Sequence, residues 1–171
     1  TMLTHFQDTE HGGFFDTSDD HETLIHRPKD LQDNAVPSAN SMAAHVLLKL
    51  SLFTGNIGYW NVAETAVSAL YEAMVQHPNA FAHWLGAAVF ITANPQEVAI
   101  IGDPNAADTK ALIDTIFAKF RPNLVVAAGE ASSIPLLTDR KQLDGKATAY
   151  VCQRFVCQQP VNTPEALAEQ L

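Results

Sequence analysis

Two carboxylates, a histidine and two cations lie close together near the start of the chain, and these residue types could carry acid–base chemistry. Asp19 and Asp20 are adjacent, His21 follows them, and Arg27 and Lys29 come soon after. A carboxylate pair could protonate a leaving oxygen and activate a nucleophile, as glycosidic chemistry requires, while the cations could hold an anionic group. The alternative is a solvated loop in which the Asp side chains form turns and the cations neutralise them.

The segment that holds this cluster, residues 1–37, is unusually rich in titratable side chains. It contains 8 of the 19 acidic residues and 4 of the 7 histidines, which predicts a functional surface. If that surface is catalytic, we expect Asp33 to join Asp19 and Asp20 in one concave pocket; dispersal over open solvent would favour a binding module. Proximity and burial should then raise the pKa of Asp19 or Asp20, unless the cations point at the pair.

Other candidate sites in the sequence are weaker. The spacing of the four N-terminal histidines matches no common zinc motif, so neither a metal nor another cofactor is predicted. Ser38 and Asn40 suit the cap of a helix, although a helix N-terminus can also bind a carboxylate or a phosphate. Residues 102–105 lie where a phosphate loop would, but they lack both GxGxxG and GK[ST].

Cys152 and Cys157 are the two cysteines of the chain. Their odd separation places them on opposite faces of a continuous strand, and five extended residues span about 16 Å. A disulfide tolerates only about 4.4–6.8 Å between Cα atoms, so a bond would need a turn around residues 153–156. Without that turn they are free thiols, which suit a reducing compartment such as the cytoplasm. A structural role and a redox role both remain open.

Composition bounds the possible classes of protein. The chain has 171 residues, of which 47% are hydrophobic and 17% charged, which is typical of a globular protein of one domain or slightly more. A net charge of -9 disfavours binding to nucleic acid or to a membrane surface. No apolar run approaches the roughly 20 residues of a membrane span, and residues 1–10 lack the pattern of a secretory signal. We therefore expect a soluble, cytoplasmic protein.

Hydrophobic periodicity predicts three segments: an acidic loop over residues 1–37, helical hairpins over 38–95 and a small α/β unit over 96–171. The fold class is thus α+β or α/β, with a three-stranded, mainly parallel sheet following the helices. The expected elements are a hairpin pairing residues 13–16 with 22–26, helices over 40–54, 59–77 and 80–93, strands over 97–102, 124–128 and 148–153, a helix between the first two strands, and a final helix opening at 163–165.

Several ordered motifs resemble those of a family of large proteins with an N-terminal thioredoxin-like domain and a C-terminal helical toroid, the spermatogenesis-associated type. The resemblance covers nearly the whole chain and suggests a C-terminal part of such a protein. The motifs that carry it are Gly12–Phe15, Ser18–Asp20, Arg27–Asp30, Asp33 with Pro37–Ser41, the strand from Val98 to Asp103, and Ala149–Cys152 with Cys157–Gln158.

The resemblance implies a function as well as a fold. The family's toroid is similar to the six-hairpin (α/α)6 barrels of glycosidases and sugar epimerases, whose sites sit in a funnel of loops. A carbohydrate-active enzyme of this kind would bind a small carbohydrate. Its catalytic residues would be Asp19, Asp20 and Asp33, and its substrate-binding residues would be His21, Arg27, Lys29 and Asn40.

A second reading is a non-catalytic binding or scaffold module that serves the thioredoxin-like domain of the full-length protein, with Cys152 and Cys157 as redox candidates. Three long helices cannot close a ring of twelve, so we expect a fragment of the toroid. Its uncovered helix faces predict self-association.

Overall fold

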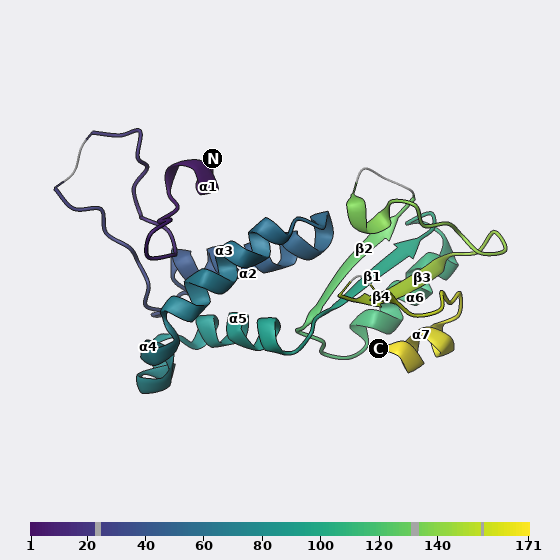
Figure 1. Cartoon of the computed structure of the whole chain (residues 1–171). Helices are drawn as coiled ribbons and strands as arrows, with labels where there is room; N and C mark the ends of the chain where they lie inside the picture. The colour runs from purple at the N-terminus through teal and green to yellow at the C-terminus, as the bar shows by residue number, and fades with distance from the viewer. Residues whose placement is uncertain (23–24, 131–133, 155) are drawn as a thin grey trace. The chain divides into compact units, whose positions relative to one another are not determined.

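The computed structural model describes residues 1–22, 25–130, 134–154 and 156–171. It divides into two compact units, one of residues 1–51 and 56–92 and the other of residues 52–55 and 93–171 (Figure 1). The described residues form seven α-helices and one four-stranded sheet, so the fold class is α+β. None of the described helices has the length and apolar character needed to cross a membrane.

Helices and their connections build the first unit. They are α1 (Met2–His5), α2 (Ala39–Thr54), α3 (Ile57–Ala69), α4 (Tyr71–Gln76), a 3-10 turn at Pro78–Ala80, and α5 (Ala82–Thr92). The last three residues of α2, 52–54, belong to the second unit. The predictions of α2 and α5 are confirmed. The single helix expected over residues 59–77 is wrong, because the Leu70 N–H bonds to the carbonyl of Val67, three residues back, and this tighter turn ends α3.

Local signals explain where α2 and α3 meet. Gly55 follows α2 with φ +70, a backbone conformation that glycine adopts without cost, and the Asn56 side chain then caps α3 by accepting from the Gly58 N–H at 2.9 Å. The buried face of α2 includes Leu47 and Leu48, whereas another flank of the helix carries exposed apolar side chains. Its residues and exposed fractions are Met42 46%, Val46 47% and Leu50 39%.

The second unit is built on a sheet of order β2-β1-β3-β4. Its strands are β1 (Gln96–Ile101), β2 (Leu124–Gly129), β3 (Thr148–Gln153) and β4 (Val156–Cys157). The expected crossover is confirmed, because β1 and β2 are parallel and α6 (Ala107–Phe117) connects them. The mainly parallel, three-stranded sheet is wrong: β3 pairs antiparallel with β1 and β4 pairs antiparallel with β3.

A tight reversal accounts for the fourth strand. Arg154 adopts φ +51, and the chain then returns beside β3 as β4 instead of continuing as one extended strand. The expected C-terminal helix is confirmed as α7 (Pro164–Gln170), with the Thr163 side chain accepting from the Ala166 N–H and Pro164 in the first turn.

The two faces of the sheet have different coverings. One face carries Val98, Ile100 and Val151 and forms a core with side chains from α6 and α7, among them Leu112 and Leu167. Alternation along the strands sends Glu97 and Cys152 to the other face. The connection after β2 covers that face, and its short helix η2 (Pro135–Leu137) contacts β1 and β2.

The acidic N-terminal segment folds back on itself. Gln7 pairs with Phe14 in an isolated antiparallel bridge, and the Asp16 N–H donates to the Pro28 carbonyl at 2.9 Å. The strand expected over residues 22–26 includes residues 23 and 24, which lie outside the described residues.

Candidate functional site

Lys29 is bound within the N-terminal segment, away from the expected carboxylate pair. Its Nζ lies 2.5 Å from Asp8 Oδ2 and donates to the Gly12 carbonyl at 2.7 Å. The hydrogen bond from Lys29, with a second from the His11 N–H, holds the pKa of Asp8 well below its usual range although burial opposes the shift. Lys29 therefore makes contacts within the N-terminal segment, which stabilise its fold.

Arg27 has a similar internal role. Its Nη2 donates to the carbonyls of His5 at 3.0 Å and Thr17 at 2.5 Å. Its guanidinium carbon lies 4.2 Å from the centre of the Phe15 ring, a cation–π contact. Two backbone carbonyls and an aromatic ring thus hold the guanidinium that we expected to contact a substrate anion.

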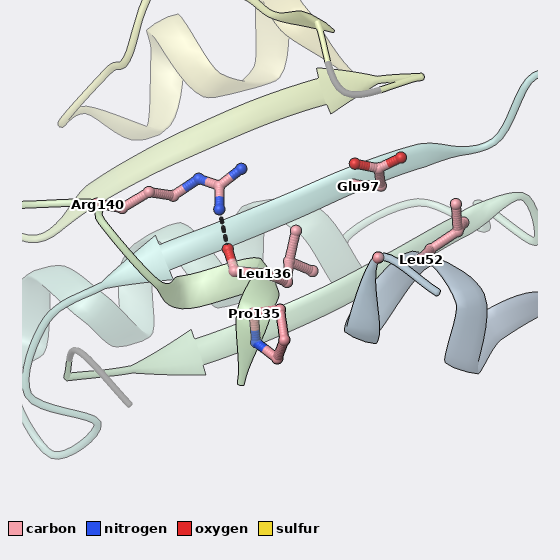
Figure 2. Close-up of a pocket in the computed structure, with 6 residues that line it drawn as sticks. Leu52, Glu97, Pro135, Leu136 and Arg140 are labelled. Carbon is pink, nitrogen blue, oxygen red and sulfur yellow. Dashed lines mark hydrogen bonds between the residues drawn. The ribbon is translucent and has the colours of Figure 1, made fainter. Parts of the chain in front are cut away.

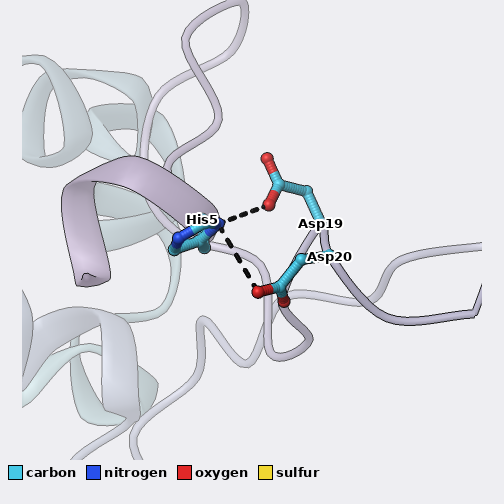
Figure 3. Close-up of side chains that lie close together, drawn as sticks. All are labelled: His5, Asp19 and Asp20. Atoms are coloured by element: carbon cyan, nitrogen blue, oxygen red, sulfur yellow. Dashed lines mark hydrogen bonds and ion pairs between the residues drawn. The ribbon is translucent and has the colours of Figure 1, made fainter.

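Asp19 and Asp20 do lie together, beside His5 (Figure 3). His5 Nδ1 is 2.8 Å from Asp19 Oδ1 and 3.9 Å from Asp20 Oδ2, and the two carboxylate side chains are 51% and 64% exposed. The expected rise in pKa is wrong for Asp20, because its hydrogen bond from the Ser18 hydroxyl lowers the pKa. The pair is an open surface cluster, and His21 is exposed beside it.

Asp33 is buried and its two oxygens serve the N-termini of two helices. Oδ1 accepts from the Ser38 N–H at 2.9 Å and the Ser41 hydroxyl at 2.8 Å, at the start of α2. Oδ2 accepts from the His83 and Trp84 N–H groups of α5 at 2.8 and 3.4 Å. Burial alone would raise the pKa of Asp33, but these hydrogen bonds outweigh it and lower the pKa. Asp33 shares no described contact with the exposed carboxylate pair.

Asn40 fastens the acidic segment to α2. Its side chain accepts from the Phe14 N–H at 2.6 Å and donates to the carbonyls of Phe14 and Asp30 at 2.9 and 3.0 Å. Of the two residues expected to cap α2, Ser38 does so by accepting from the Ser41 N–H at 3.2 Å. All the polar atoms of the Asn40 amide group therefore have partners within the protein.

Cys152 and Cys157 form a disulfide between β3 and β4. The turn around residues 153–156, which the sequence required for a bond, is present, and it makes the two cysteines direct cross-strand partners with Cα atoms 3.9 Å apart. The expectation of free thiols is therefore wrong. The cysteines differ in accessibility, because Cys152 is 1% exposed whereas Cys157 lies on the exposed short strand.

Arg140 places a positive charge beside both sulfur atoms. Its Nη2 is 3.4 Å from Cys152 Sγ and 3.7 Å from Cys157 Sγ. Nη1 donates to the Leu136 carbonyl, and the guanidinium carbon lies 5.6 Å from the centre of the Tyr150 ring. A nearby cation stabilises a thiolate relative to a thiol, so the guanidinium lies where a thiolate would form if the disulfide opened.

Glu97 is a buried carboxylate next to the disulfide. It pairs with Cys152 across β1 and β3, it is 2% exposed, and its Oε1 has no hydrogen-bond partner in the described part of the chain. Burial raises the pKa of Glu97, and the charge of Arg140 opposes this shift only partly. Glu97 and Arg140 line a cavity of about 180 Å³ together with Leu52, Gly55, Pro135 and Leu136. Figure 2 shows the side chains of Glu97 and Arg140 in this region.

A second hollow, of about 240 Å³, opens on the exposed side of the disulfide. Besides the two cysteines it is lined by Val156 and by the amide side chains of Gln96, Gln153 and Gln158. Val156 is 75% exposed, so an approaching molecule would meet an apolar side chain and neutral hydrogen-bonding groups around Cys157.

Sequence reasoning identified the cysteines but missed Arg140 and Glu97. A glutamate at the first position of an expected strand looks like its solvated end, although the period-two alternation of β1 places Glu97 on the same face as Ala99 and Ile101, both buried. That alternation was the available signal. Arg140 lies in a connection, and nothing in its sequence neighbourhood indicates that the connection folds back over the sheet.

Comparison with curated proteins finds similarity to spermatogenesis-associated protein 20 from three mammals. Over 167 residues the chain is 35% identical to the human protein, 34% to the rat protein and 33% to the mouse protein. Each match covers 93% of this chain but only 21% of the relative, so the chain spans about a fifth of the length of these proteins. No family model matches the chain.

Proposed function

We propose that this chain is a thiol–disulfide exchange module whose reversible centre is the Cys152–Cys157 pair. The observation that carries the proposal is the position of Arg140, whose Nη2 lies within hydrogen-bonding distance of both sulfur atoms. A disulfide that only staples a hairpin needs no cation at its sulfurs. A reversible one benefits, because the thiolate is both the nucleophile and the leaving group in exchange.

The accessibility of the two sulfurs gives the exchange a defined order. A thiolate of the partner attacks the exposed Cys157, a new sulfur–sulfur bond forms there, and Cys152 leaves as a thiolate beside Arg140. A second thiolate of the partner then attacks its own sulfur in the mixed disulfide and releases Cys157. Two electrons pass from the partner dithiol to the module, and the two partner protons end on Cys152 and Cys157.

The partner class that suits this reaction is a protein dithiol, and the resemblance described above points to a thioredoxin-like domain. The hollow beside Cys157 supports a polypeptide partner, because its amide side chains and the exposed Val156 can contact backbone groups and an apolar side chain. A module of this kind would relay electrons between the thioredoxin-like domain and a further substrate.

Equilibration with redox buffers tests the proposal. The protein is incubated with thioredoxin and its reductase at a series of defined potentials, alkylated, and analysed by mass spectrometry for the state of Cys152 and Cys157. We expect the midpoint potential, at which the oxidised and reduced forms are present in equal amounts, to lie between about -180 and -300 mV, the range of catalytic and regulatory disulfides. A bond that remains oxidised below that range is a structural staple, and this result would refute the proposal.

Arg140→Gln provides the specific variant, and Lys146→Gln, which removes an exposed cation from the same unit, is its control. Removing the cation should raise the thiol pKa, because the thiolate loses a neighbouring positive charge. A thiolate with a higher pKa is more nucleophilic, which partly offsets the smaller fraction of thiolate in the variant. The reduced variant should therefore attack a small disulfide about 3- to 10-fold more slowly than wild type at pH 7. Equal rates for wild type and Arg140→Gln would show that the guanidinium has no part in exchange.

The carbohydrate-active enzyme remains a prediction that rests on the resemblance. Glycosidic chemistry needs two carboxyl groups that flank one bond, and the contacts of Asp33 with the starts of α2 and α5 occupy both of its oxygens. The carboxylates of Asp19 and Asp20 have no described contact with a helix N-terminus. Loss of carbohydrate binding on Asp19→Asn or Asp20→Asn in a protein of the relatives' full length would support that function.

A further inference from the structure

We propose that Glu97 carries the proton of Cys152: it protonates the thiolate that forms when the disulfide opens and removes the proton when the disulfide closes. This role rests on the exchange reaction proposed above. It concerns a step that the cysteines and Arg140 leave unexplained, because Cys152 is 1% exposed and direct proton exchange between its sulfur and bulk water is restricted.

The pairing of β1 with β3 places the two groups together. Glu97 and Cys152 are directly opposite in the register, and side chains of opposite residues in an antiparallel pair stand on the same face with Cβ atoms about 4.5–5.5 Å apart. The described contacts contain no direct hydrogen bond between the carboxylate and Cys152 Sγ. Transfer therefore runs through a change of rotamer or through one water molecule.

The cavity beside Glu97 provides the space for that water. A water molecule occupies about 30 Å³ in the liquid, so a volume of about 180 Å³ has room for several. A buried water also needs polar partners, and the wall supplies the Glu97 carboxylate and the Arg140 guanidinium among apolar side chains (Figure 2). A carboxylate oxygen without a protein partner, facing such a cavity, is the group expected to bind it.

The surroundings of Glu97 favour repeated gain and loss of a proton. On its own strand the same face continues with Ala99, β2 contributes the register partner Val125, and η2 contributes Leu136, none of which is charged. Among the described residues, the groups of other elements that face it and can carry charge are Arg140 and Cys152. Apolar burial raises the pKa of the Glu97 carboxyl group and so favours its protonated form, whereas the charge of Arg140 favours the ionised form.

The step balances in both directions. On opening, the partner thiolate bonds to Cys157 Sγ, the pair of electrons of the disulfide passes to Cys152 Sγ, and protonated Glu97 gives its proton to that thiolate and is reprotonated from solvent. On closing, the Glu97 carboxylate takes the proton of the Cys152 thiol, the Cys152 thiolate attacks Cys157 Sγ in the mixed disulfide, and the partner leaves as a thiolate.

A two-phase reaction with dithionitrobenzoate separates this step from the first attack. The reduced protein releases one thionitrobenzoate ion when Cys157 attacks the probe and a second when Cys152 closes the disulfide, so both phases are seen in the same absorbance trace. We expect Glu97→Gln to leave the first phase within about 2-fold of wild type and to slow the second about 10- to 100-fold at pH 7. The difference should shrink toward about pH 9, where hydroxide removes the thiol proton directly.

Two further variants make the result specific. Glu165→Gln removes an exposed carboxylate of α7 and should leave both phases unchanged. Glu97→Asp retains a carboxyl group and should recover part of the second phase, which a purely structural role of Glu97 does not predict. If Glu97→Gln fails to fold, the wild type and Glu97→Asp still provide the comparison, because equal second phases at every pH would count against proton transfer.

The outcomes distinguish this inference from the proposed function. A normal first phase with an equal second phase in wild type and Glu97→Gln between pH 6 and about pH 9 overturns the role of Glu97 and leaves the exchange reaction intact. Absence of the second phase in the wild type itself means that the cysteines do not close a disulfide, which overturns both.

Discussion

Replacing Asp33 should strongly destabilise the first unit. Its carboxylate accepts four hydrogen bonds, two at the start of α2 and two at the start of α5. Hydrogen bonds to a charged group contribute about 1.5–3 kcal/mol each, but relaxation and entering water recover part of the sum. Breaking such a buried charged network costs about 3–5 kcal/mol, so we expect a loss of that size for Asp33→Ala.

Asp33→Asn tests the charge separately from the shape. The Asn amide retains one acceptor oxygen, but its NH2 group faces the donors at the start of either α2 or α5. We therefore expect the free energy of unfolding to fall by about 2–3 kcal/mol near neutral pH. The folded-state pKa of Asp33 lies below its unfolded value, so its contribution is complete above the unfolded value of about 3.9 and is lost as pH falls through the folded one. The difference between wild type and Asp33→Asn should therefore shrink in acid.

Urea unfolding followed by tryptophan fluorescence measures these changes in the relevant unit. The chain has 2 tryptophans, and both belong to the first unit, with Trp84 fully buried. Asp30→Asn, at an exposed position of the same segment, is the control and should change stability by less than about 0.5 kcal/mol. A loss below about 1 kcal/mol for Asp33→Ala, or a difference that does not depend on pH, would refute the assignment of Asp33 as a shared helix cap.

Three other substitutions test the remaining contacts. Asn40→Ala removes three hydrogen bonds, two of them buried, and should cost about 2–3 kcal/mol in urea unfolding, with faster proteolysis of residues 1–37. Gly102→Ala places a Cβ against the Thr109 hydroxyl and should lower the thermal stability of the second unit by about 1–3 kcal/mol, seen by circular dichroism; an unchanged melting temperature would contradict that contact. Asp8→Asn removes the carboxylate partner of Lys29 and should cost about 2–4 kcal/mol at neutral pH, less as pH falls, because the low pKa of Asp8 makes its contribution acid-sensitive.

The elements that the sequence predicted well are those with local signals. Helix α2 has a Ser cap and a Gly stop, and α7 has a Thr cap followed by proline. Strands β1 and β2 are short apolar runs on either side of an amphipathic helix, so their parallel pairing follows from the crossover. Each of these signals lies within about ten residues of the element that it specifies.

The failures concern contacts that local patterns do not encode. The chain reverses direction between Gln153 and Val156. This short reversal converts the expected single strand into a hairpin and brings the two cysteines together. Asp33 looks like a loop carboxylate because its partners in α5 lie 50 and 51 residues further along the chain. Alternation along β1 could have placed Glu97 on a buried face, but its pairing with Cys152 depends on a register that only the folded sheet defines.

The central place of β1 in the sheet has a consequence for synthesis of the chain. Its apolar residues 98–101 are almost fully buried and need β2 on one edge and β3 on the other. The third strand leaves the ribosome about 50 residues after β1, which at 5–20 residues per second is a delay of a few seconds. During that time an apolar strand with an open edge is exposed to other nascent chains, so we expect the second unit to depend on chaperones more than the helical unit, whose contacts between neighbouring helices form as each helix emerges.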